Sequence, residues 1–241
     1  MRHPILAMSA LTLTATAPAP HKVVRSTPAL DFSYEWPVQA VAIPPLDLRF
    51  YTDAKKALAE AQKNARDDET SATKDKRPFH QHFYSMQWSQ AGQSARLLSL
   101  QSELGIFEGG AHPNSVHGAL LWDRVAKREI TTGSLFLRST AFQALTRSRY
   151  CSALNAERRK RRGGENVDMP DFNACPKYSE LAIAITDTNG NGRFDAIEFV
   201  ASPYTAGPYV EGAYEIAVPM TSHLIGAIKP QYRNAFERQR Q

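Results

Sequence analysis

The stretch ITDTNGNGRFDAIEF, from Ile185 to Phe199, sets the narrowest limit on how this chain can fold. Apolar residues alternate with a period of two before it, in LAIAI, and after it, in AIEFVAS. Such alternation indicates β-strands, whereas a helix repeats its apolar positions every three to four residues. The two Asn-Gly pairs between the strands favour the positive φ angles of a tight hairpin turn. The sequence therefore predicts an antiparallel hairpin here.

The same stretch also matches the calcium-loop template D-x-[DN]-x-[DN]-G-x5-E. A hard cation such as calcium needs several oxygen ligands at alternating positions, and an EF-hand also needs a helix on each side. Strand flanks argue against an EF-hand and place the last acid in the outgoing strand. A plain turn explains the Asn-Gly pairs but not the additional acids, so a calcium site and a plain turn both stay open. The candidate ligands are Asp187, Asn189, Asn191, Arg193 through its carbonyl oxygen, Asp195 and Glu198.

The remaining pattern indicates an α+β protein built on antiparallel sheet with a few helices. Strands are predicted over 29–37, 79–92, 94–110, 181–185, 196–202 and 214–220, with a turn at Ala91 and Gly92. A further strand, a turn and a short extended piece are predicted over 118–137. Helices are predicted over 46–69, 141–162 and 222–241, the last interrupted at Pro230, and a charged loop over 70–78. For the first helix, the recurring face contains Leu48, Tyr51, Lys55 and Leu58.

The first residues have the layout of a secretory signal peptide. A short basic start, an apolar run and small residues fill positions 1–19, and the run is too short to span a bilayer. The possible cleavage sites at Ala17 and Ala19 are each followed by proline, which leaves the cleavage point open. No later segment approaches a membrane span. We expect a periplasmic or secreted protein without stable membrane insertion.

The two cysteines, Cys151 and Cys175, are the only ones in the chain. In an oxidising compartment such a pair most simply forms a disulfide, which would contribute about 3 kcal/mol by restricting the unfolded chain. Two reduced, buried thiols become the better interpretation only if the signal peptide is absent.

Basic residues outnumber acidic ones by 29 to 24, and many of them crowd one segment. Such a cluster can attract nucleic acid, anionic lipid or an acidic wall polymer. No aromatic residues interleave with it to stack on bases, so we favour a solvated helix end and expect no nucleic-acid partner. The cluster consists of Arg147, Arg149, Arg158, Arg159, Lys160, Arg161 and Arg162.

Two stretches carry a family resemblance. Residues 105–136 contain Phe107, then G-G-A-H-P-N, a strand, a Thr-Gly turn and a Leu-Phe pair, and residues 202–224 contain P-Y-x-x-G-P-Y-x-x-G before a strand and a closing helix. They resemble the exported domain of unknown function, family number 3298, of RsiV-type anti-sigma factors. Upstream, DFSYEWPVQ and the elements after it resemble the companion domain, family number 4163, seen beside PdaC-type peptidoglycan deacetylases.

The resemblance implies a division into a signal peptide over 1–19, a companion-like part over 20–106 and an RsiV-like domain over 107–241. RsiV-type ectodomains bind lysozyme, whereas PdaC-type enzymes deacetylate through a separate catalytic domain that nothing in this chain resembles. We therefore expect a non-catalytic envelope module that binds a lysozyme-like protein or a peptidoglycan glycan, for sensing or inhibition. No sequence feature sets its oligomeric state.

Histidines and one glutamate are the weak catalytic candidates. Glu108 precedes His112 by four residues, so His112 can be a general base oriented by Glu108 in a hydrolase acting on wall polymer. The structural alternative is a sharp glycine turn with a packed histidine, and it is favoured because no ligand or triad spacing accompanies the pair. His80 and His82 form H-x-H, which suits a metal pair or two structural histidines.

Tyr204 and Tyr209 are the candidate ligand-binding residues. They lie among prolines and glycines, where an aromatic loop can stack on sugar rings or contact a protein. The structural alternative is that both rings fix the loop against the sheet. Calcium is the one possible cofactor, and a calcium-stabilised structural domain is the remaining functional alternative.

Overall fold

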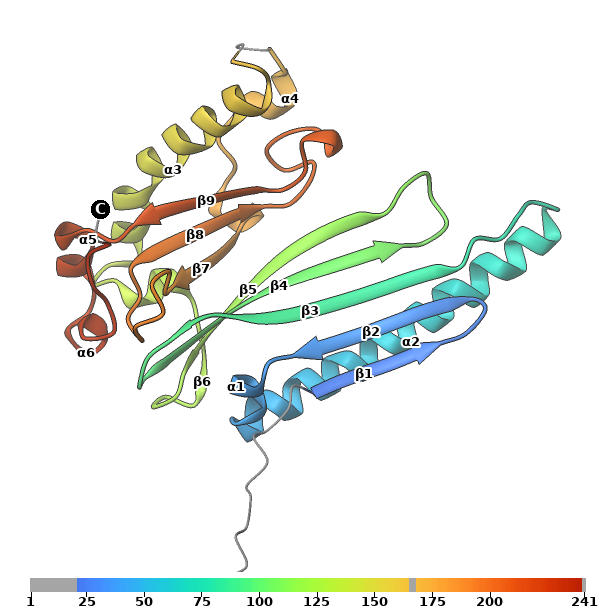
Figure 1. Ribbon diagram of the computed structural model, residues 1–241, viewed down its shortest axis with the longest axis horizontal. Coiled ribbons are helices and arrows are strands. Elements are labelled where there is room, and N and C mark those ends of the chain that lie inside the picture. The colour runs from blue at the N-terminus through green and yellow to red at the C-terminus, as the bar shows by residue number, and fades with distance from the viewer. Residues whose placement is uncertain (1–20, 165–167, 240–241) are drawn as a thin grey trace, which may run out of the picture.

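The computed structural model describes residues 21–164 and 168–239 and has four layers: helix, sheet, sheet and helix (Figure 1). One sheet has six strands in the order β1-β2-β3-β4-β5-β6, and the other has three in the order β7-β8-β9. The predicted α+β fold with mainly antiparallel sheets is confirmed. The predicted signal peptide lies outside the described residues.

The first sheet follows chain order, with one parallel pair. Its strands are antiparallel except for β2 and β3, which are parallel because the long helix α2 carries the chain back between them. Their bounds are β1 His21–Ser26, β2 Leu30–Trp36, β3 His82–Gln93, β4 Leu97–Phe107, β5 Asn114–Asp123 and β6 Arg128–Ile130. The predicted boundary at 106/107 falls at the end of β4, so this sheet contains strands from both predicted parts.

Helix α2, Pro44–Lys74, covers the outer face of this sheet (Figure 1). Its buried stripe contains Leu46, Phe50 and Ala54, whereas Leu48 is 65% and Tyr51 is 49% exposed. The predicted face is therefore wrong. The true buried face repeats every four residues and continues with alanines, so it does not stand out in an alanine-rich sequence. The charged loop expected from residue 70 is helical up to Lys74. The short helix α1, Val38–Val41, precedes α2.

The second sheet packs beneath helix α3, Ser139–Arg161. Its strands, β7 Ala182–Thr186, β8 Ala196–Ala201 and β9 Tyr214–Pro219, agree with the predicted ones. Fully buried Tyr150, Phe199 and Tyr214 fill the core between α3 and this sheet.

Pro230 begins α6, Pro230–Arg233, after α5, Ser222–Ala227, so the predicted interruption is confirmed. Helix α4, Pro170–Asn173, and 3₁₀ turns at Thr132–Leu135, Tyr178–Glu180 and Tyr209–Glu211 complete the chain.

Gly92 marks the point where the two sheets cross. The turn predicted at Ala91 and Gly92 is wrong, since β3 continues through them with an irregular register and turns only after Gln93. A Cβ on Gly92 would lie 2.8 Å from the Phe194 ring and 2.9 Å from the Asp187 nitrogen, and that N–H donates to the Ala91 oxygen at 3.1 Å. A glycine inside a strand often allows such a close backbone approach.

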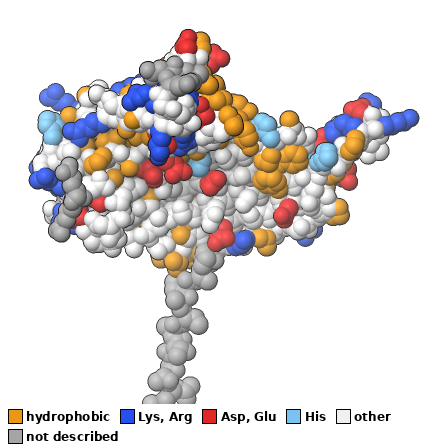
Figure 2. Space-filling view, turned by 45° about the horizontal axis from the view of Figure 1, so that its top comes forward, with side chains coloured by type: hydrophobic (Ala, Val, Ile, Leu, Met, Phe, Trp, Pro, Cys, Tyr) orange, Lys and Arg blue, Asp and Glu red, His pale blue; other side chains and the backbone are white. Residues whose placement is uncertain are grey.

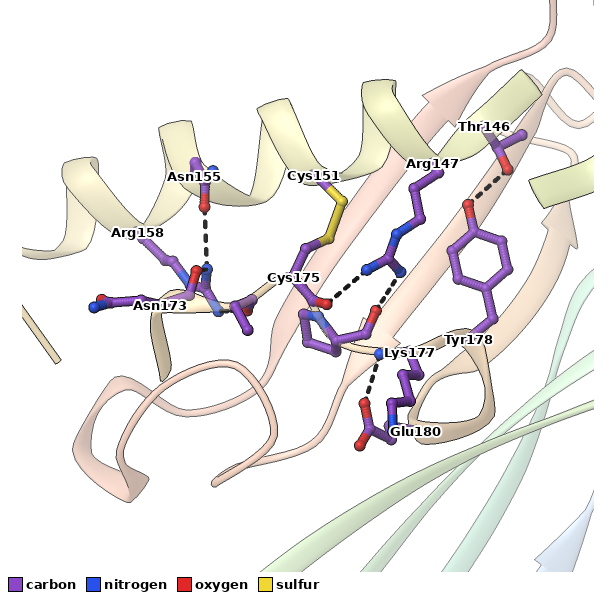
Figure 3. Close-up of a disulfide and its surroundings, with 12 residues drawn as sticks. Thr146, Arg147, Cys151, Asn155, Arg158, Asn173, Cys175, Lys177, Tyr178 and Glu180 are labelled. Atoms are coloured by element: carbon purple, nitrogen blue, oxygen red, sulfur yellow. Dashed lines mark hydrogen bonds between the residues drawn. A yellow bond between two sulfur atoms is a disulfide. The ribbon is translucent and has the colours of Figure 1, made fainter. Parts of the chain in front are cut away.

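The predicted disulfide between Cys151 and Cys175 is present, with the two Cα atoms 5.6 Å apart (Figure 3). It ties α3 to the segment that leads into β7. Arg147 reinforces this link by donating to the carbonyl oxygens of Cys175 and Pro176 at 2.7 and 2.6 Å. A disulfide is compatible with export. Within the described ranges, no helix is long and apolar enough to cross a membrane.

Candidate functional site

Three aromatic side chains from two distant loops form a stacked group, which we call the aromatic ledge: His112, Tyr204 and Tyr209. His112 lies in the loop between β4 and β5, and both tyrosines lie in the loop between β8 and β9. The ring centroids of His112 and Tyr209 are 3.9 Å apart, and those of the two tyrosines are 5.7 Å apart. Tyr204 is 51% exposed. The ledge therefore presents aromatic surface to solvent where a loop of one sheet meets a loop of the other.

Hydrogen bonds fix the His112 ring. Its Nδ1 lies 2.7 Å from the Pro113 carbonyl oxygen, which can only accept, so Nδ1 carries the proton. In the neutral ring Nε2 then accepts from the Tyr204 hydroxyl, 3.1 Å away. Tyr204 has a φ of +68°, a left-handed conformation that is unfavourable for a bulky residue. Residues held in such strained conformations concentrate at binding and active sites.

Basic residues at the end of α3 hold the tyrosine loop in place. Arg158 is 4% exposed and donates through Nε to the Ala206 oxygen at 2.9 Å. Arg162 donates to both carboxylate oxygens of Glu211, at 2.8 and 3.0 Å, and this bond lowers the pKa of Glu211. Arg161 donates to the carbonyl oxygens of Glu211 and Ala213. Much of the basic cluster thus organises the loop that carries the ledge.

Glu108 and His112 contact different partners. The Glu108 carboxylate accepts from the Asn64 amide of α2 at 2.9 Å, whereas the ring nitrogens of His112 bond to the Pro113 carbonyl oxygen and the Tyr204 hydroxyl. A catalytic pair would need a direct bond or one bridging water between them. The hydrolase hypothesis stays a prediction, and the geometry favours the packed, structural interpretation of His112.

The stretch that matches the calcium template is the hairpin loop between β7 and β8. Asp187 accepts from the backbone N–H groups of Gly190, Asn191 and Gly192 at 2.8, 3.2 and 2.7 Å. Asp195 accepts from the backbone N–H and the hydroxyl of Thr188 at 2.9 and 2.6 Å. These carboxylates therefore supply the acceptors that the turn itself requires.

The last acid of the template faces away from this loop. Glu198 lies in β8 and accepts from the Gln101 amide of the first sheet. The amides of Asn189 and Asn191 donate instead to Glu237, at 2.8 and 2.7 Å, and the Arg193 guanidinium donates to the Phe236 oxygen. In the described part of the chain, no group of three or more His, Cys, Asp or Glu side chains is arranged to hold a metal. Calcium binding stays a prediction.

We expect Asp187→Ala to lower the free energy of unfolding by about 1–3 kcal/mol, because the N–H groups of Gly190 and Gly192 lose their acceptor and that of Asn191 loses one of two. Urea unfolding in calcium and in EDTA measures this loss, and it should be equal in both if the loop is a plain turn. Asp187→Asn keeps an acceptor oxygen and should lose less. A wild-type stability that rises with calcium, and does not rise in Asp187→Ala, would instead establish the calcium site.

His80 and His82 do not act as a pair. His80 precedes β3 and is exposed, whereas His82 begins β3, is 3% exposed and lies 3.1 Å from an Asp68 oxygen. Both the histidine–aspartate bond and the stacking within the ledge join residues far apart in sequence. Short spacing rules could not reveal either contact.

Comparison with known proteins identifies structures with a similar fold. A family model described as deacetylase PdaC matches residues 23–115. A DUF3298 family protein from Pseudomonas aeruginosa PAO1 is similar in structure, with a TM-score of 0.58 and 16% identity over 95% of this chain and 100% of that one. A DUF3298 family member from Bacteroides fragilis NCTC 9343 has a TM-score of 0.56 and 14% identity over 90% and 95%. These similarities show a shared fold. No curated protein matches the sequence.

Proposed function

We propose that this protein is an exported binding module of the cell envelope that recognises a lysozyme-like protein through the aromatic ledge. The observation that carries the proposal is the stack of His112, Tyr204 and Tyr209 on the surface. Aromatic residues are enriched at protein interfaces, where a rigid cluster contributes much of the binding energy. Both loops of the ledge also carry the motifs that resemble RsiV-type ectodomains.

The surroundings of the ledge favour a protein partner. Val210, directly after Tyr209, is 89% exposed, and Val116, early in β5, is 46% exposed. Val116, Pro203 and Thr205 line one surface groove next to Tyr204. Figure 2 shows hydrophobic side chains gathered in patches on one face of the molecule. Exposed apolar side chains around an aromatic centre are typical of a protein-binding surface.

A wall glycan is the second candidate ligand. The half-exposed Tyr204 ring is suited to stacking on the apolar face of a sugar. Peptidoglycan accompanies a lysozyme-like protein in the envelope, so the same ledge can be tested against both.

The alternatives have less support from the geometry. A hydrolase that used Glu108 and His112 would require both side chains to leave the partners described above. A calcium-stabilised domain would require the acidic hairpin loop to bind a cation without Glu198. The deacetylase in the name of the matching family model describes that family.

The test is binding of the mature protein to purified lysozyme and, separately, to peptidoglycan fragments. We expect Tyr209→Ala and His112→Ala each to weaken binding of the partner by about tenfold or more, because each removes a ring from the stack. Tyr51→Ala is the matched control, since Tyr51 is an exposed tyrosine on the distant helix α2. Biolayer interferometry would measure each dissociation constant.

Two outcomes would overturn the proposal. One is wild-type protein that captures neither lysozyme nor peptidoglycan. The other is a Tyr209→Ala variant that binds as well as Tyr51→Ala. A hydrolytic activity lost in both Glu108→Gln and His112→Ala would favour the enzyme instead.

A further inference from the structure

A cavity of about 320 Å³ lies between α2 and the first sheet. Binding sites for small molecules are typically concave, mostly apolar and about 300–1,000 Å³ in volume. The helix side consists of Ala57, Glu60, Ala61 and Asn64. The sheet side includes Leu30 at the start of β2, Tyr84 in β3 and Ile106 at the end of β4.

The cavity exists because α2 presents small residues at this level. Positions 57, 61 and 64 follow the three-to-four-residue spacing of one helix face, and two of them are alanine. Nearer the start of α2, the large Phe50 packs against Trp88 at 5.0 Å between ring centroids and leaves no equivalent space. The small side chains of α2 therefore leave the space that forms the cavity.

One end of the cavity is formed by a buried histidine held by an acid. His82 is 3% exposed, and its Nε2 lies 3.1 Å from an oxygen of Asp68, which also accepts from the Arg77 guanidinium. The bonds from Arg77 and then His82 lower the pKa of Asp68, so this carboxylate is ionised and accepts a hydrogen bond from the Nε2–H of His82. Nδ1 makes no hydrogen bond to any residue that the structure describes. With the proton on Nε2, Nδ1 of the neutral ring is an acceptor, and His82 is one of the residues that line the cavity.

Gly109 lies next to His82 and Asp68. A Cβ at Gly109 would lie 2.9 Å from an Asp68 oxygen and 3.5 Å from His82 Nε2, and its φ is +81°. The backbone of the G-G-A-H-P-N loop thus lies directly against the histidine–aspartate bond, which only a glycine allows. Glu108, the preceding residue, lines the mouth of the cavity.

The polar groups at the mouth define the charge of the ligand. Glu60 and Glu108 are both exposed carboxylates there, and none of the described lining residues is Lys or Arg. Leu30, Ile106 and the two alanines supply the apolar part of the lining. A ligand that suits the cavity is compact and positively charged, with several hydrogen-bond donors and one apolar face.

We propose that this cavity binds an amino sugar. The apolar face of the sugar ring lies against Leu30, Ile106 and Ala61, its ammonium group faces Glu60 and Glu108, and a hydroxyl donates to His82 Nδ1. The site is separate from the aromatic ledge and does not depend on the function proposed for it. A free amine, in place of an acetylated one, is the feature that the two carboxylates select.

The test compares glucosamine, N-acetylglucosamine and glucose by calorimetric titration and saturation-transfer NMR at low ionic strength. We expect glucosamine to bind at least tenfold more tightly than either neutral sugar. Ala61→Leu fills the cavity and should weaken glucosamine binding at least tenfold. Ala59→Leu, the same change at an exposed position of α2, should leave glucosamine binding unchanged. Glu60→Gln, a change at an exposed site, should reduce the preference for the amine.

The ledge variant His112→Ala separates this proposal from the previous one, because it should bind glucosamine like the wild type. Equal binding by Ala61→Leu and Ala59→Leu would overturn the assignment of the cavity. Equal binding of glucosamine and glucose, or no binding of any of the three sugars, would overturn the assignment of the ligand.

Discussion

Replacing Asp123 with Ala is expected to lower the free energy of unfolding by about 3–5 kcal/mol, the loss that follows when one partner of a buried ion pair is removed. Asp123 is fully buried at the end of β5. Its carboxylate accepts from Arg96 Nη2 at 2.9 Å, from the Tyr232 hydroxyl at 3.0 Å and from the Val125 N–H at 2.9 Å. The substitution would leave these donors unsatisfied and separate α6 from the first sheet.

The same group makes stability depend on pH. Burial alone would raise the pKa of Asp123, but the hydrogen bonds from Arg96, the Ala126 N–H and Tyr232 lower it below its ordinary value. A carboxyl whose folded pKa is depressed stabilises the protein above its unfolded pKa of about 3.9. This contribution is lost as the pH falls through the folded pKa. Wild-type stability should therefore decline below about pH 4, and Asp123→Ala should show a smaller decline.

Urea unfolding at pH 7 and pH 3 measures both effects. Asp31→Ala is the matched control, since Asp31 is an exposed aspartate in the same sheet. The network would be unimportant if Asp123→Ala and Asp31→Ala were equally stable at pH 7.

Removing the disulfide is expected to have the second largest effect. In the chain-entropy description, the Cys151–Cys175 bond, which spans 24 residues, contributes about 3 kcal/mol. The double variant Cys151→Ala/Cys175→Ala should lose this amount. A reductant should lower the stability of the wild type to the same level and leave the double variant unchanged.

Arg158 connects this bond to the ledge. Besides Ala206, its guanidinium donates to the carbonyl oxygens of Asn173 and Ala174, next to Cys175 (Figure 3). We therefore expect the double variant also to bind the ledge partner more weakly. A double variant as stable as the oxidised wild type would show that Arg147 and Arg158 alone are sufficient to hold this segment.

Local patterns were enough to predict the strands of the second sheet and the disulfide. The strands alternate with period two, and a lone cysteine pair leaves one pairing. The buried face of α2 was not predictable, because alanine fits both buried and exposed helix positions. Leu48 and Tyr51 also have the spacing of a buried face, although both are exposed. Gly92 was assigned to a turn because sequence cannot show that another sheet passes over it.

The candidate site was predictable in its residues but not in its arrangement. His112, Tyr204 and Tyr209 were each identified from a motif, yet His112 and Tyr204 are 92 positions apart, and their bond depends on how the two sheets dock. The small residues of α2 that leave room for the cavity are visible in the sequence, but the cavity itself is not. It depends on small residues of one helix lying opposite a histidine whose acidic partner comes from that same helix.

The ledge has a mechanical consequence. One of its rings belongs to a hairpin of the first sheet and the other two to a loop of the second, so neither sheet alone contains the binding surface. A partner that covers all three rings fastens the two sheets to each other. The bound partner would therefore oppose any force or fluctuation that separates the two sheets. Binding can then be detected as slower backbone amide exchange near Gly92, where the sheets cross at a distance from the ledge.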